Sequence, residues 1–167
     1  MLKLNQENLN MTTFANLFLP TWMLPVIPSI LWPILLVLNF LMDSLVLYLW
    51  MKVKKVNDPL AVWKKSIAKI WLCGFAADFL ACILLLLVSI NADSLFGNLN
   101  IFIGIGGVLY GGFGCLFAAV LIWVFNRFFT LKKTSLSLSQ IKSAAVFLAV
   151  FTAPYLLMLP TEWIYNW

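Results

Sequence analysis

Four long apolar stretches constrain this chain more than any other feature of its sequence. They run over Ser29–Met51, Ile70–Ile90, Ile101–Phe125 and Ser143–Pro160. Each is long enough to cross the hydrocarbon core of a bilayer, which takes about 17–25 residues at ~1.5 Å rise per residue. Backbone amides and carbonyls in lipid must be paired within the chain, so the stretches are expected to be helices. The sequence therefore predicts an all-α, polytopic membrane protein, a four-transmembrane-helix bundle.

The composition agrees with a single integral membrane domain over residues 1–167. Hydrophobic residues make up 63% of the chain and charged residues only 10%, whereas soluble domains carry about 25% charged residues. The segment 14–28 is also apolar, but Pro20, Pro25 and Pro28 interrupt it. Because proline removes a backbone donor and breaks helices, we expect this segment to be interfacial or re-entrant.

The basic residues indicate an orientation in the membrane. Of the 11 Lys and Arg residues, all but Lys3 lie in the loops 52–69 and 126–142. Cytoplasmic loops are enriched in Lys and Arg, so both loops are predicted to be cytoplasmic and both termini outside. The strong preference for Lys over Arg indicates an AT-rich genome, and we expect a bacterial cytoplasmic membrane. The expected partners are the bilayer itself and anionic lipids at the Lys-rich loops, rather than nucleic acid.

Two carboxylates interrupt the apolar stretches. Asp43 lies nine residues before Lys52, and Asp78 lies nine residues after Lys69, so both should sit about 13 Å from the inner boundary on antiparallel helices. Asn39 lies one turn before Asp43, on the same helix face. Burying a carboxylate mid-span costs about 2.5–3.5 kcal/mol, and two together repel unless they share a proton or a cation. Asp43, Asp78 and Asn39 are therefore candidate proton or cation ligands. Alternatively, each acid holds the helix packing through hydrogen bonds, with Asn39, Ser44, Tyr110 or Thr152 as partners.

Small residues indicate where helices pack together. Gly107, Gly111 and Cys115 are spaced by four in the third stretch, and Gly74 stands one turn before Asp78. Such residues let helix backbones approach closely in lipid. We expect this packing groove to contact another helix of the same chain; a homo-oligomer or a membrane partner subunit is the alternative. The chain has no histidine, which excludes Ser-His or Cys-His catalysis and imidazole metal sites, and no cofactor or metal is expected.

Helix ends carry their own signals. Asp58 before Pro59 predicts an N-cap and a second helix that begins well before the membrane. Ser137 and Gln140 have the spacing of a capping box at the start of the fourth helix.

Pro154 should kink that fourth helix. Thr152 and Tyr155 would then lie near the carbonyls that the proline frees.

Three function classes fit this pattern. The first is a channel or transporter, or the membrane subunit of a larger complex, that handles a proton or cation through Asp43 and Asp78. The second is a non-catalytic accessory or scaffold protein. The third is an intramembrane aspartyl hydrolase, in which the two acids activate a water.

The hydrolase class is suggested by a short resemblance. The segment "GFAADF", Gly74–Phe79, resembles the acid-containing helix of the bacterial lipoprotein signal peptidases. The Asn-x-x-Asp-Arg element of that family is missing, as is the presenilin Gly-x-Gly-Asp signature, and the predicted termini lie on the opposite side of the membrane. We therefore rank the hydrolase last of the three classes.

Overall fold

The computed structural model describes residues 31–91 and 104–159, and the regular structure within them is helical. The expected interfacial segment 14–28 lies outside these residues. The long helices are α2 (Leu31–Val53), α3 (Pro59–Ile90), α5 (Gly104–Phe125) and α6 (Leu138–Phe151). A π-helix, η2 (Asn126–Thr130), and a 3-10 turn, η3 (Leu131–Lys133), extend α5, and a second 3-10 turn, η4 (Tyr155–Met158), follows α6.

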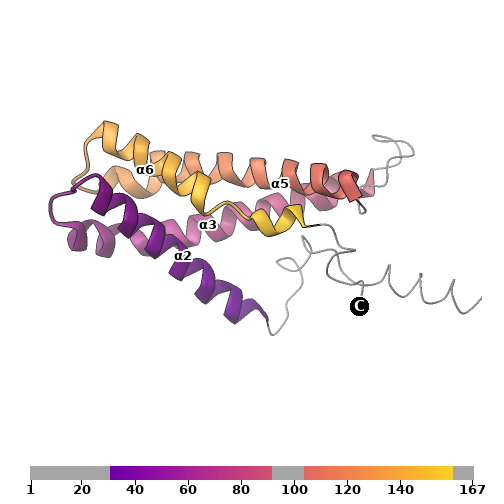
Figure 1. The fold of residues 1–167 in the computed structure, drawn as a ribbon, viewed down its shortest axis with the longest axis horizontal. Helices are drawn as coiled ribbons and strands as arrows, with labels where there is room; N and C mark the ends of the chain where they lie inside the picture. Colours follow the sequence, from indigo (N-terminus) through magenta and orange to yellow (C-terminus); the bar gives the residue numbers. More distant parts are fainter. Residues whose placement is uncertain (1–30, 92–103, 160–167) are drawn as a thin grey trace, which may run out of the picture.

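Four segments of this fold are long and apolar enough to cross a membrane. They comprise 33–53, 59–90, 104–133 and 138–158. The prediction of an all-helical chain with four such segments is confirmed. The helices run side by side along the long axis, with the loop between α2 and α3 and the loop between α5 and α6 at the same end (Figure 1).

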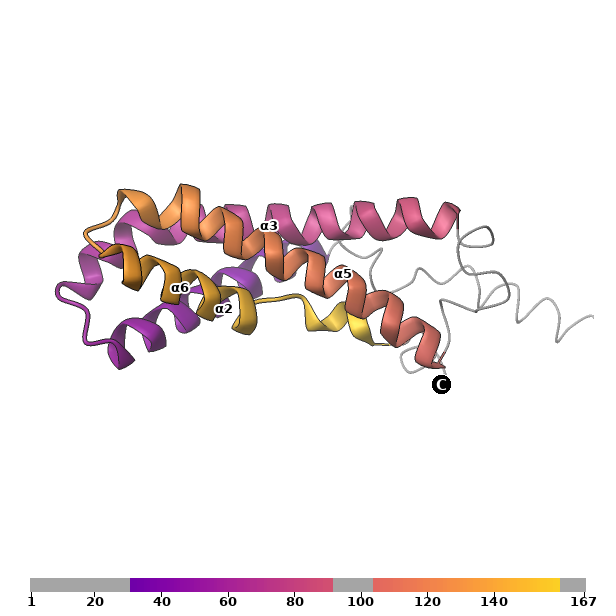
Figure 2. The same ribbon diagram turned by 90° about the horizontal axis from the view of Figure 1, so that it is seen from above.

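The helices form a ring in which α3 and α6 each contact both α2 and α5. Leu47 and Trp50 of α2, Ile70 of α3, Ile122 of α5 and Leu148 of α6 meet in the core at the end that carries both short loops. Figure 2 shows α5 crossing over η4 in the other half of the molecule. In this half a second, smaller core is formed by α3, α5 and η4, and α2 takes no part in it. The ring is therefore closed on four sides only over about one half of its length.

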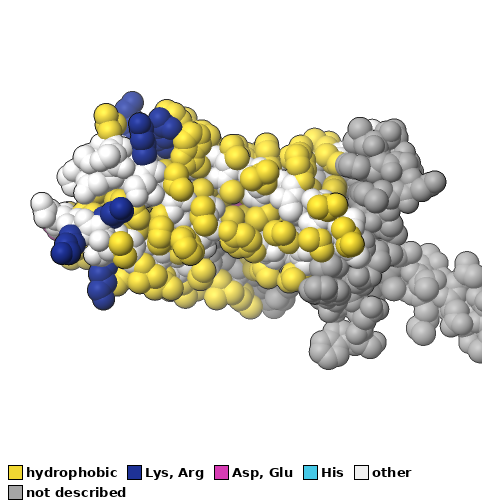
Figure 3. Space-filling view, turned by 45° about the horizontal axis from the view of Figure 1, so that its top comes forward, with side chains coloured by type: hydrophobic (Ala, Val, Ile, Leu, Met, Phe, Trp, Pro, Cys, Tyr) yellow, Lys and Arg dark blue, Asp and Glu magenta, His cyan; other side chains and the backbone are white. Residues whose placement is uncertain are grey.

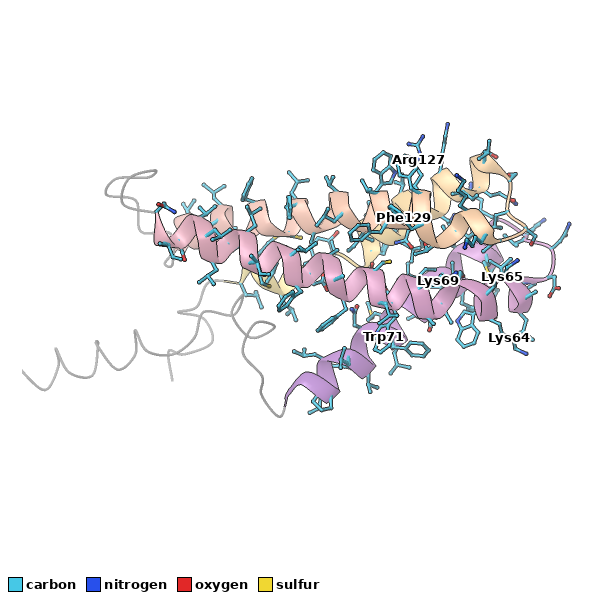
Figure 4. All side chains as sticks on the ribbon, turned by 180° about the vertical axis from the view of Figure 1, so that it is seen from behind. Lys64, Lys65, Lys69, Trp71, Arg127 and Phe129 are labelled. Carbon is cyan, nitrogen blue, oxygen red and sulfur yellow. The ribbon has the colours of Figure 1, made fainter. Side chains whose placement is uncertain are left out.

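Two side-chain hydrogen bonds join α2 to its neighbours. The indole of Trp71 on α3 donates to the carbonyl of Leu36 at 3.0 Å. The indole of Trp50 on α2 donates to Ser143 Oγ of α6 at 3.2 Å. Figure 4 shows Trp71 beside α2. These bonds help to hold α2 against α3 and α6, while the first turns of α2 diverge from the other helices (Figure 1).

Both predicted helix caps are confirmed. Asp58 Oδ1 accepts a hydrogen bond from the amide of Ala61 at 3.3 Å, and Pro59 is the first residue of α3. At the start of α6, Ser137 Oγ accepts from the amide of Gln140, and Gln140 Oε1 accepts from the amide of Ser137. The second helix thus begins 11 residues before the apolar stretch that starts at Ile70, as the cap predicted.

The fourth span is broken, and the predicted kink at Pro154 is wrong. The helix ends at Phe151, and a short irregular stretch separates it from η4. Because Pro154 has no N–H, the carbonyl of Val150 cannot be paired by the helical ladder. The hydroxyl of Tyr155 donates to this carbonyl instead, while the amide of Tyr155 turns back to the carbonyl of Ala153 at 2.8 Å. The predicted role of Tyr155 beside a freed carbonyl is therefore confirmed.

The outer surface separates into an apolar belt and a basic end. Large apolar side chains are exposed along all four helices, and they cover the middle of the molecule in Figure 3. The Lys and Arg side chains gather at the end with the two short loops, and among the coloured residues no acidic side chain shows on the face drawn. Figure 4 shows Lys64, Lys65 and Lys69 on the first turns of α3, with Arg127 on the neighbouring helix.

Candidate cation or proton site

Asp43 is the most deeply buried acid of the described chain. It lies in the middle of α2 and is 1% exposed. Its side chain packs against Gly74 of α3, where a Cβ atom would come within 3.3 Å of Asp43 Oδ2 and 4.0 Å of Oδ1. The carboxyl group thus occupies space that a side chain at position 74 would need. Gly74, predicted as a helix-packing residue, is the residue that admits this carboxyl group between α2 and α3.

The end of α6 also reaches Asp43. The side chain of Thr152, which caps α6, interacts with the Asp43 carboxyl group. The hydroxyl of Thr152 also donates to the carbonyl of Leu148 at 2.9 Å. One hydroxyl proton cannot serve both partners, so a proton or cation between the oxygens of Asp43 and Thr152 would satisfy the pair.

The break in the fourth span adds negative potential at this place. The last four carbonyls of a helix have no intrahelical partner, and the helix dipole leaves about half a negative charge at this end. Because α6 ends at Phe151, this negative end lies next to Thr152 and Asp43.

Asp78 stands one turn beyond Gly74 on α3. Its carboxyl group interacts electrostatically with that of Asp43. The residue is half-buried, and its Oδ1 atom is buried without a hydrogen-bond partner. The small buried residues Ala77 and Ala81 flank it. The two acids therefore interact, with Asp78 one turn beyond the α3 residue that meets Asp43.

Asn39 extends the polar face of α2 by one turn from Asp43. It is half-buried, and its Nδ2 atom has no hydrogen-bond partner. Within residues 31–91 and 104–159, the buried side-chain nitrogen and oxygen atoms without a partner are Asn39 Nδ2, Asp43 Oδ2, Ser44 Oγ and Asp78 Oδ1. Three of these four belong to the predicted ligand set. Unpaired buried polar groups are costly, so these atoms are the ones that a bound ligand could satisfy.

The nearest basic residues along the two helices are remote from the acids. Lys52 and Lys69 each lie nine residues away, which is about 13 Å along a helix. Arg127 stacks over the rings of Trp123 and Phe128, with its guanidinium carbon 5.0 and 5.1 Å from their centroids. Its charge is thus held among aromatic rings near the basic end.

Two residues of the predicted packing groove on α5, Gly111 and Cys115, are buried, and Gly107 is half-buried. The sequence reasoning missed Gly114, where a Cβ atom would come within 2.6 Å of the Leu85 side chain on α3. Beside Gly111 and Cys115, the buried face of α5 includes a second line of residues spaced by four: Gly106, Tyr110, Gly114, Ala118 and Ile122. Six glycines in the stretch offered several such lines, and spacing alone could not choose between them.

Tyr110 lies on this observed line. Its hydroxyl donates to the carbonyl of Leu85 on α3, and the residue is 6% exposed. Tyr110 thus belongs to the contact between α3 and α5.

Thr152 is one of the hydrogen-bond partners that the sequence offered for the acids, and its side chain interacts with Asp43. Nothing in the sequence set the height of α6 against α2, so the sequence could not choose Thr152 over the other candidates.

The chain matches no known family model, no curated protein and no solved structure. Its function must therefore be inferred from the geometry of its own residues.

Proposed function

We propose that this chain is an integral membrane protein that holds a proton or a small cation between Asp43 and Asp78. It acts as a channel- or transporter-type protein, or as the membrane subunit of a larger complex. The observation that carries the proposal is Asp43 Oδ2, an unpaired oxygen on a residue that is 1% exposed, beside a second acid. Buried acids within membrane helices commonly mark ion paths and proton relays.

The proposal places the basic end of the bundle in the cytoplasm. The loops 52–69 and 126–142 lie together at this end (Figure 1), and clustered Lys and Arg residues favour the cytoplasmic side. Both termini are then outside. With this orientation the acids lie roughly 13 Å inside the basic boundary, near the middle of a hydrocarbon core about 30 Å thick.

Energetics favour a bound positive charge. Each uncompensated carboxylate at mid-membrane depth costs about 2.5–3.5 kcal/mol, and mutual repulsion adds to this cost. A proton or cation at the pair removes the repulsion and is further stabilised by the negative end of α6. Broken membrane helices whose carbonyl ends face an ion are a recurring design of ion-coupled transporters.

A small bundle limits how the site is reached. The ring of four helices is filled by the two apolar cores. A pathway to Asp43 therefore requires a second copy, a partner subunit or a movement of α2. This favours a role within an oligomer or a larger complex over a pore inside one chain.

The test uses the full-length protein in liposomes. We expect proton or monovalent cation flux with the wild type, and a loss of at least tenfold in Asp43→Asn and Asp78→Asn. The matched control is Asp58→Asn, because Asn caps helices as well as Asp and residue 58 is exposed at the basic end. Absence of flux at every pH tried would count against an autonomous channel or transporter. Unchanged flux in Asp43→Asn would refute the proposal that Asp43 forms the ion site.

A non-catalytic scaffold is the second candidate. The contact between Thr152 and Asp43 favours it, because this contact also ties α6 to α2. A scaffold would keep its function in Asp43→Asn and lose it when a bulky residue replaces Gly111. If the ion site carries the function, Asp43→Asn should reduce it more than a bulky residue at Gly111 does.

A further inference from the structure

A groove runs along the outside of the bundle between α2 and the start of α3. Its volume is about 470 Å³. Its walls are formed mainly by apolar and aromatic side chains: Leu45, Tyr48 and Met51 of α2, and Pro59, Leu60 and Trp63 of α3. Tyr48 and Leu60 are 53% and 59% exposed, so the groove opens outward rather than into the core.

Basic residues flank this groove on both helices. Lys52 lies one turn after Tyr48 on α2, and Lys64 lies one turn after Leu60 on α3; residues four apart share a helix face. Both lysines are exposed. Asp58 is the acid at this end of the described chain, and its side chain accepts a hydrogen bond from the amide of Ala61 as a helix cap. Because the two helices run in opposite directions, Lys52 lies toward the loop end of the groove and Lys64 lies one turn farther from the loop than Leu60. Both place positive charge beside an apolar channel.

We propose that the groove binds one anionic phospholipid, with an acyl chain along the apolar wall and the phosphate between Lys52 and Lys64. Basic pockets between membrane helices on the cytoplasmic side bind anionic head groups. Tyr48 and Trp63 suit the same depth, because such rings prefer the membrane interface. The inference rests on the membrane insertion proposed above but is independent of the acids, so either can fail alone.

The charge pattern selects this occupant. An apolar groove by itself would accept any acyl chain, but the two lysines favour a head group with net negative charge. Each lysine near the surface should contribute about fivefold in affinity, which corresponds to about 1 kcal/mol.

The test uses the quenching of Trp63 fluorescence in delipidated, detergent-solubilised full-length protein. The probes are brominated phosphatidylglycerol and brominated phosphatidylcholine, and Trp63→Phe supplies the signal of the other tryptophans. We expect phosphatidylglycerol to bind more tightly. Lys52→Gln and Lys64→Gln should each reduce that preference about fivefold. The control Lys132→Gln/Lys133→Gln, exposed on the other loop of the basic end, should retain the preference.

Three results would overturn the proposal. Equal affinity for the two lipids would show that the groove does not select charge. An equal loss of preference in the control variant would assign the effect to the diffuse charge of the basic end. Absence of quenching at Trp63 by either lipid would show that protein, not lipid, covers the groove. Leu60→Phe, which fills the groove from an exposed position without adding a tryptophan, should weaken the binding of both lipids in a protein of unchanged melting temperature.

Discussion

Replacing Gly111 by alanine should push η4 away from α5. A Cβ atom at Gly111 would lie 1.9 Å from the carbonyl oxygen of Leu157, 2.6 Å from its carbonyl carbon and 2.9 Å from Met158 Cα. All three atoms belong to the backbone, so no rotamer change can relieve the clash. The backbone would have to retreat from 1.9 Å to an ordinary contact of 3.4 Å, about 1.5 Å. Overpacking of this kind costs about 1–3 kcal/mol.

The neighbouring glycine supplies the matched control. A Cβ atom at Gly112 would meet only the terminal methyl group of Met158, at 3.7 Å. Both substitutions gain the same helix propensity of about 1 kcal/mol, so their difference isolates the clash. The free energy of unfolding in detergent micelles, titrated with a denaturing detergent, should be about 1–3 kcal/mol lower for Gly111→Ala than for Gly112→Ala. Equal stabilities would refute the close contact between α5 and η4.

Three further outcomes follow from local contacts. Tyr155→Phe should lower the free energy of unfolding by about 1–3 kcal/mol, because the carbonyl of Val150 loses its donor; an unchanged thermal melt would mean that another donor replaces it. Ser137→Ala should cost about 1 kcal/mol through loss of the cap, and Ser137→Asp should restore it; equal melting of all three proteins would contradict the capping role. Cysteines at Lys55 and Ser135 should react with an impermeant maleimide from the same side of oriented vesicles, the cytoplasmic one, and labelling from opposite sides would rule out the proposed topology.

The helices and their caps were predictable because their signals are local. The apolar stretches fix which segments are helical, and Asp58, Ser137 and Gln140 fix two helix starts through contacts within one turn. The close approach of Asp43 and Asp78 was predicted because a short loop joins two antiparallel helices. Counting from the lysines did not give their heights, since α2 ends one residue after Lys52 and α3 begins ten residues before Lys69. Gly74 meets the Asp43 carboxyl group, and Asp78 lies one turn farther along α3.

Features that depend on packing between distant helices could not be predicted. Pro154 indicated a disturbance of the fourth helix, but whether the chain kinks or stops depends on η4 packing against Gly111. The contact of Gly114 was missed because it is selected by the Leu85 side chain of α3, which packs against that glycine. The position of Thr152 beside Asp43 depends on the height of α6 in the ring, which no sequence pattern reports.

The most direct test of the central claim measures whether a positive ion stabilises the protein through the acid pair. Thermal unfolding of the full-length protein in detergent would be followed as Na⁺ replaces a bulky organic cation at constant ionic strength, and over a series of pH values. We expect stability to rise with Na⁺ or proton concentration, by about 2.7 kcal/mol when a ligand reaches 100 times its Kd. The same changes should leave Asp43→Asn/Asp78→Asn unaffected. Identical responses in the wild type and the double variant would contradict the claim that Asp43 and Asp78 form an ion site.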